Sequence, residues 1–269
     1  MFDIDDFFVS NNIKNIDINK IIDRYNYFKK SSIPEDHLIQ HFKVLLQDTD
    51  NNIMFKKNEI KNKPLQEFWT LCFIDMANNN SVDLFAERKY SFDENDLKEI
   101  INICYKKNII PEIRNYLNTK GINLYFIEPL DGTKIDGAVY ITEYSTIAIG
   151  ISARYERLDH ILFTLLHELS HIVLHIRYLT DGIVSIENSQ EDIEVEANRL
   201  VKDSIIRPEL YRVCLPKKTR NSTDLIKFAN ENYIHPVLLA GIIRRDLNNY
   251  YIFNDIIQKY KVNKNELYE

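Results

Sequence analysis

Residues 165–175 read LLHELSHIVLH and contain two histidines four residues apart, His167 and His171, with Glu168 directly after the first. On an α-helix, residues at this spacing lie one turn apart on the same face, so both imidazoles can reach a single metal ion at about 2.0 to 2.1 Å. The glutamate projects to the side of that pair, where its carboxylate can take a proton from an attacking water. The segment therefore predicts a helix that carries a catalytic metal centre, with His167 and His171 as ligands and Glu168 as general base.

The residues around this motif give the predicted helix two different faces. At about 100° of rotation per residue, an apolar stripe lies opposite a polar face. The stripe consists of Leu158, Leu162, Leu165, Leu169, Ile172 and Ile176, and the polar face consists of His160, Thr164, His167, His171 and His175. The alternative without a metal is that the histidines are structural, and each buried ring without a hydrogen-bond partner then costs about 1 to 3 kcal/mol.

A third protein ligand is expected, because a catalytic zinc site normally has three and keeps a fourth position for water. On the predicted helix 191–205, Glu194 and Glu196 lie on opposite borders of the apolar face, and periodicity alone does not separate them. Asn198 stands one turn after Glu194, where its amide oxygen can accept the second ring N–H of a ligand histidine. We therefore predict Glu194 as the ligand, Asn198 as the residue that orients a ligand histidine, and Glu196 as an exposed charge.

The remaining histidines are weaker candidates for metal ligands. His37 and His41 share the four-residue spacing but have no base between them, so we interpret them as part of a solvated helix, with a second metal site as the alternative. His160 and His235 are expected to be structural. His175 lies on the ligand face about 6 Å beyond the second ligand histidine. We expect it to line the cleft or to support a ligand.

The order of apolar patterns predicts the fold class. Apolar residues recur at helical spacing over about residues 18–118, for example at Leu97, Ile100, Ile101 and Cys104. Three β-rich runs follow at 121–127, 134–142 and 146–152, and helical spacing returns at 155–176 and 191–205. This order predicts an α+β fold that is mostly helical, with a small antiparallel three-stranded sheet packed beside the HExxH helix.

Composition narrows the partners and the compartment. The 269 residues carry a formal net charge of −6, so the chain lacks the positive field that phosphate binding requires, and direct nucleic-acid binding is not expected. Its three cysteines are widely separated and form no CxxC pair, which fits neither a disulfide framework nor a thiolate zinc site. The acidic start is unlike a secretory signal, and no apolar run approaches the roughly 20 residues of a membrane span. We therefore expect a cytoplasmic protein without a membrane partner.

Four motifs in this order resemble the signatures of the ImmA/IrrE metallopeptidases. They are Arg157, FTLLHELSHIVLH at 163–175, EVEAN at 194–198 and IHPVLLAG at 234–241. The similarity covers roughly residues 96–251, and Ser170 stands where the family more often has glycine, at a position that does not face the metal. The resemblance implies a gluzincin-like fold, in which one zinc ion is held by the two histidines and a downstream glutamate.

The resemblance also implies a function, a zinc-dependent endopeptidase that cleaves or disables a helix-turn-helix repressor and so switches on mobile-element, prophage or stress genes. On this basis we expect an ImmA/IrrE-like metallopeptidase domain at 96–269 and a helical region of unknown role at 1–95. Some relatives carry a DNA-binding helix-turn-helix domain before the peptidase, but that pattern is not convincing in this region. The stretch 51–63, rich in asparagine and lysine, is either a linker or a surface loop.

Other functions and roles stay open at the level of sequence. The chain can be a non-catalytic binding module that captures a regulator, although such a module has no need for Glu168, or a toxin or defence component that uses the same metal site. One of the runs 134–142 and 146–152 can hold a peptide as an edge strand, or both can be interior strands. Candidates for the group that stabilises the oxyanion, by residue type only, are Tyr140, Tyr144, Tyr155 and Arg199.

Overall fold

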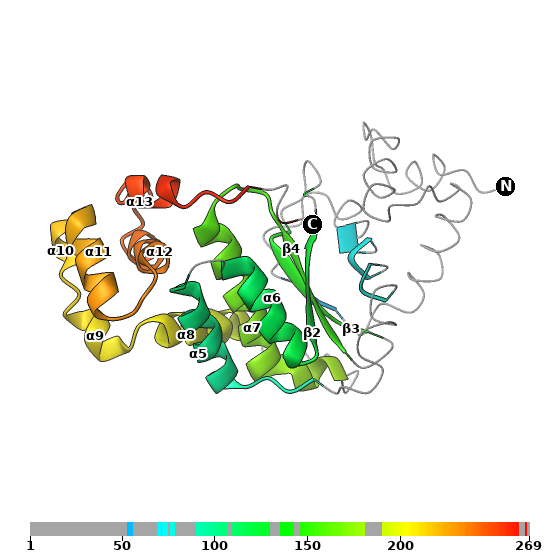
Figure 1. Ribbon diagram of the computed structural model, residues 1–269. Coiled ribbons are helices and arrows are strands. Elements are labelled where there is room, and N and C mark those ends of the chain that lie inside the picture. The colour runs from blue at the N-terminus through cyan, green and yellow to red at the C-terminus, as the bar shows by residue number, and fades with distance from the viewer. Residues whose placement is uncertain are drawn as a thin grey trace.

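The computed structural model confirms the α+β class, with many helices around one small sheet (Figure 1). It describes residues 53–55, 69–70, 72–74, 76–78, 90–106, 109–127, 129, 135–142, 146–180, 190–263 and 267. The strands are β1 (Ile53–Phe55), β2 (Ile122–Ile127), β3 (Gly137–Ile141) and β4 (Ile147–Ser152). The helices are α5 (Glu94–Cys104), α6 (Ile109–Thr119), α7 (Leu158–Thr180), α8 (Gln190–Ile205), α9 (Pro208–Arg212), α10 (Pro216–Thr219), α11 (Ser222–Glu231), α12 (Pro236–Asp246) and α13 (Asn254–Lys259).

The three predicted strands, β2, β3 and β4, are confirmed, but the sheet is mixed and not purely antiparallel, and a fourth strand extends it in the order β1-β3-β4-β2. β4 pairs antiparallel with β3 and parallel with β2. The parallel pair arises because the chain passes over one strand position after β2 and then folds back through a short β3–β4 connection, which places β4 in the gap. The fourth strand, β1, pairs with β3 and lies inside the stretch 51–63, for which a linker or a loop was expected.

Both faces of the sheet are covered, which explains why every residue of β4 is buried. On one face Val139 and Ile149 join the core formed with α5, α6 and α7. On the other face, the ring of Phe73, which belongs to the helical residues 72–74, lies against Gly150. A Cβ added at Gly150 would be 2.8 Å from this ring. Alternating strand residues therefore pack on two different layers.

The helix α5 confirms the apolar pattern found in the sequence, since Leu97, Ile100, Ile101 and Cys104 are all buried. Its start is fixed by Asp93, whose side chain accepts the backbone N–H groups of residues 95 and 96 in a capping box. After α6, Gly121 adopts a φ of 74° and turns the chain into β2. The helices α5 and α6 thus pack against α7 and the sheet and support them.

The helix with the HExxH motif, α7, lies between the sheet and the C-terminal helices (Figure 1). Both predicted helices are confirmed, although α7 begins three residues and ends four residues later than expected, and α8 begins one residue earlier. The helix α12 crosses α7 closely, because a Cβ added at Gly241 would lie 2.2 Å from the ring of Phe163. Among the described residues, no helix combines the length and the apolar character needed to cross a membrane.

Residues 1–50 lie outside the described part of the chain, and so do His37 and His41. The division into regions 1–95 and 96–269 therefore stays a prediction. Within the described part, β1 belongs to the sheet, and the ring of Phe73 packs on it.

Candidate metal centre

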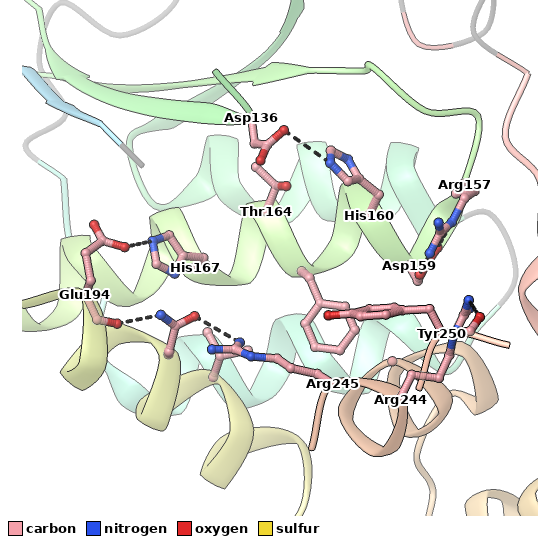
Figure 2. A pocket seen from close by; sticks show the side chains of 14 residues that line it. Asp136, Arg157, Asp159, His160, Thr164, His167, Glu194, Arg244, Arg245 and Tyr250 are labelled. Atoms are coloured by element: carbon pink, nitrogen blue, oxygen red, sulfur yellow. Dashed lines mark hydrogen bonds and ion pairs between the residues drawn. The ribbon is translucent and has the colours of Figure 1, made fainter. Parts of the chain in front are cut away.

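Three possible metal-binding residues from α7 and α8 lie close together, as the sequence predicts. Nε2 of His167 lies 3.0 Å from Nε2 of His171. One carboxylate oxygen of Glu194 lies 3.1 Å from the first ring nitrogen, and its other oxygen lies 3.4 Å from the second. Figure 2 shows Glu194 reaching across from α8 to His167. The structure therefore contains a group that can hold a metal ion.

The spacing of these donors fits tetrahedral zinc. Donor atoms at about 2.0 to 2.1 Å from a tetrahedral ion lie about 3.3 Å from one another. The separation of the two ring nitrogens, 3.0 Å, lies close to this value, and each ring nitrogen has a different oxygen of Glu194 at 3.1 or 3.4 Å. The donor set of two imidazoles and one carboxylate is also a set that catalytic zinc sites use.

Burial gives the site a low dielectric and fixes its ligands. His167 and His171 are almost fully buried, whereas Glu194 is partly exposed. Burial raises the pKa of Glu194, but its hydrogen bonds and charge interactions with the two histidines outweigh this and lower the pKa to about 2. The carboxylate is therefore ionised at neutral pH, which is the form that binds a metal.

A chain of hydrogen bonds behind the site orients His171, the second candidate ligand. Nδ1 of His171 lies 3.1 Å from Nδ1 of His175, and Nε2 of His175 lies 3.1 Å from a carboxylate oxygen of Glu196. Because a carboxylate only accepts, His175 donates from Nε2 to Glu196 and accepts at Nδ1 from His171. Burial lowers the pKa of His175 despite its bond to Glu196, which favours the neutral ring this arrangement needs. Nε2 of His171 is then left with its lone pair toward the metal position.

The role predicted for Asn198 is wrong. Its amide nitrogen donates to the backbone carbonyl of Glu194 at 2.7 Å, and its amide oxygen accepts from Nη1 of Arg245 at 3.1 Å. The amide oxygen thus bonds to α12 and not to a ligand histidine. His175 provides the histidine contact instead, because its place one turn beyond the second ligand brings the two rings together. Asn198 supports the backbone at Glu194.

The predicted base, Glu168, is fully buried against the strand β3. A Cβ added at Gly137 would lie 2.7 Å from Oε1 of Glu168 and 2.8 Å from Cγ2 of Thr164. Only a residue without a side chain therefore leaves room for this carboxylate. Because Thr164 also lines the cleft described next, Glu168 lies just behind the cleft wall.

A cleft of about 600 Å³ extends from the metal site along α7. Figure 2 shows His167 and Glu194 at one end, Thr164 and His160 in the middle, and Arg157 at the other end. His160, expected to be structural, lines this cleft and lies with Nε2 3.3 Å from Asp136. His235, also expected to be structural, caps α12 by accepting the N–H of residue 237 at 3.2 Å.

None of the candidates for stabilising the oxyanion is among the described residues that line the cleft. Tyr140 is buried and accepts a hydrogen bond from Asn78 at its hydroxyl. Tyr155 packs on His160 and is half exposed. Arg199 points to solvent and pairs with a neighbouring aspartate, and Tyr144 lies outside the described residues.

Neither β3 nor β4 is an edge strand, so the prediction that one of them holds a peptide by strand addition is wrong. Val139 pairs with Met54 on one side and Ile149 on the other. Ile147 pairs with Ile122 and Ile141. The strand β1 covers the edge of β3 that the sequence left open.

Several contributors to the site were not predicted from the sequence. Gly137 is one of only six glycines and interrupts a β-rich run, which is a signal for a close approach. Glu196 was interpreted as an exposed charge, although its contact with His175 involves it in the site. Arg244 and Arg245, which line the cleft from α12, gave no local signal because a basic last turn is common in helices.

No known family model matches the chain. No curated protein matches it either. The resemblance to the ImmA/IrrE metallopeptidases thus stays an interpretation of the motifs.

Proposed function

We propose that this chain is a zinc-dependent peptidase. The observation that carries the proposal is the meeting of His167, His171 and Glu194 in a group that can hold a metal ion, with the buried Glu168 directly after the first histidine. When bound, zinc supplies a Lewis acid for the scissile carbonyl and lowers the pKa of water at the site.

The chain's own residues have separate tasks in this proposal. The two histidines and Glu194 hold the ion, and the His175–Glu196 pair keeps one histidine in the tautomer that binds it. Glu168 takes a proton from the attacking water and passes it to the leaving amine. Gly137 leaves the space in which that carboxylate is held.

The cleft supports an extended peptide as the substrate. From His167 to Arg157 it follows ten residues of α7, which is about 15 Å at 1.5 Å per residue. An extended chain rises about 3.3 Å per residue, so four to five substrate residues fit along it. A helix-turn-helix repressor as the physiological substrate rests on the resemblance to the ImmA/IrrE family, whereas the expected cytoplasmic location rests on the spacing of the cysteines.

The proposal is tested by incubating the zinc-loaded protein with a candidate repressor from the same genetic neighbourhood. Glu168→Gln keeps the size of the base and removes its proton affinity, so it should bind zinc and fail to cleave. Glu209→Gln, at an exposed glutamate of α9, is the matched control and should cleave normally. Equal cleavage by Glu168→Gln and the unchanged protein would refute the assignment. Tight repressor binding without cleavage by either protein would favour a binding module.

A further inference from the structure

The end of the cleft away from the metal site contains a buried guanidinium. Arg244, near the end of α12, is only 4% exposed and lines the cleft. Nη2 donates to the backbone carbonyl of Tyr250. Its other two nitrogens, Nε and Nη1, are buried and have no hydrogen-bond partner among the described residues. Leaving donors of a charged group unsatisfied is costly, so this arrangement is unusual for a purely structural arginine.

The charges around Arg244 do not balance it. Arg157 donates to Asp159 through Nε at 3.0 Å, so the carboxylate whose charge acts on Arg244 already has a partner. Burial lowers the pKa of Arg244, and the charge of Arg157 acts in the same direction, whereas Asp159 opposes them. Arg245 also lines the cleft, but its guanidinium donates to Asn198 at 3.1 Å, on the side of Glu194. Asp136, further along, pairs with Arg154 at 3.0 Å. This end of the cleft therefore carries excess positive charge.

We propose that Arg244 forms a subsite for a substrate carboxylate, an acidic side chain or a free C-terminus. This inference rests on the proposed peptidase function and adds a specificity determinant to it. A carboxylate supplies the acceptors and the negative charge that the buried guanidinium lacks. The ring of Tyr250 lies over the guanidinium, 5.8 Å from Cζ, and is 57% exposed. A ligand reaches the buried nitrogens only if this surface ring rotates.

The position of the subsite sets where the carboxylate must stand in the substrate. Arg244 lies beside Asp159, as Figure 2 shows, and Asp159 precedes His167 by eight residues on α7. Eight residues of helix span about 12 Å. An extended peptide covers this distance in three to four residues. The acidic group is therefore three or four residues from the scissile bond.

The test uses the full-length, zinc-loaded chain and short peptides that carry a hydroxamate to bind the metal. Two series, with the hydroxamate at either end, cover both directions along the cleft. In each series the third or fourth residue is glutamate or glutamine, and the peptide has no other charge. A glutamine peptide with a free C-terminal carboxylate is added, to distinguish a preference for an acidic side chain from a preference for a free C-terminus. In calorimetry, at least one carboxylate peptide should bind at least about 10-fold more tightly than the neutral peptide it is paired with.

Variants assign this preference to one residue. Arg244→Met should reduce the preference for the carboxylate peptide to less than about twofold. Arg199→Met, at an exposed arginine outside the cleft, should leave this preference unchanged. Equal affinity for carboxylate and neutral peptides in the unchanged protein would overturn the subsite, whether or not Arg244→Met folds. A preference that persists in a folded Arg244→Met protein would overturn it as well.

A second readout does not depend on the metal. In metal-free protein, the ¹⁵Nε signal of Arg244 should shift saturably when the preferred carboxylate peptide without its hydroxamate is added, and stay in place with the neutral peptide. No shift would contradict the subsite. If the hydroxamates do not bind but this shift occurs, the metal centre fails and the subsite stands. If the hydroxamates bind without preferring a carboxylate, the subsite fails and the metal centre stands.

Discussion

Gly137→Ala should remove activity while leaving the metal site intact. The new Cβ would lie 2.7 Å from Oε1 of Glu168 and 2.8 Å from Cγ2 of Thr164, where ordinary contacts are at least 3.4 Å. The carboxylate must therefore move by about 0.7 Å, and a misplacement of about 1 Å at a catalytic group can cost about 100-fold in rate. We expect kcat to fall by about 10- to 100-fold. Zinc affinity should change by less than about threefold, because the new methyl group is directed at the base and not at the ligands.

Gly150→Ala is the matched control for this prediction. The added Cβ would lie 2.8 Å from the ring of Phe73, a similar overlap on the opposite face of the sheet. Both variants should lose about 1 to 3 kcal/mol of stability through overpacking. Only Gly137→Ala should lose kcat when the rate of peptide cleavage is divided by the zinc-loaded fraction. An unchanged kcat in Gly137→Ala, or an equal loss in both variants, would refute the placement of Glu168.

Further predictions concern the groups behind the metal site and the cap of α12. In a chelator competition, His175→Ala should weaken zinc binding by about 10- to 100-fold, and Asn198→Ala should weaken it much less. A larger loss in Asn198→Ala would instead support the asparagine as the residue that orients a ligand histidine. Burial lowers the pKa of His235 to about 4, while the unfolded chain takes up this proton near pH 6.5. Its contribution to stability is thus full above pH 6.5 and decreases as the pH falls toward 4, by about 3 kcal/mol. His235→Asn keeps an acceptor for the cap and should lack this decrease in urea denaturation from pH 7 to 4; parallel curves for the two proteins would contradict it.

The sequence predicts the parts of this structure that depend on local periodicity. The two helices of the site follow from the 3.6-residue repeat, and the choice of Glu194 over Glu196 agrees with the geometry. The reason for that choice did not hold, because Asn198 bonds to Arg245 on α12, 47 residues away in the chain. A contact made across that separation depends on how the helices pack.

The sheet shows the same limit. The alternation of apolar residues identifies β2, β3 and β4 but does not specify which strand lies between the other two. β1 is only three residues long and comes from a polar stretch, so it has no periodicity to detect. Arg244 gave no signal either, since its importance arises from its burial in the fold. Long-range pairing and burial thus decide what the pattern leaves open.

The most direct test of the proposed metal centre is the zinc affinity of metal-free protein, measured by competition with a chromophoric chelator. The unchanged chain should bind one zinc ion, as should Glu196→Ala with an affinity at most about 10-fold weaker. Glu194→Ala should lose far more, since it removes one of three ligands. Equal affinities for Glu194→Ala and the unchanged protein, or a larger loss in Glu196→Ala, would contradict the centre described here.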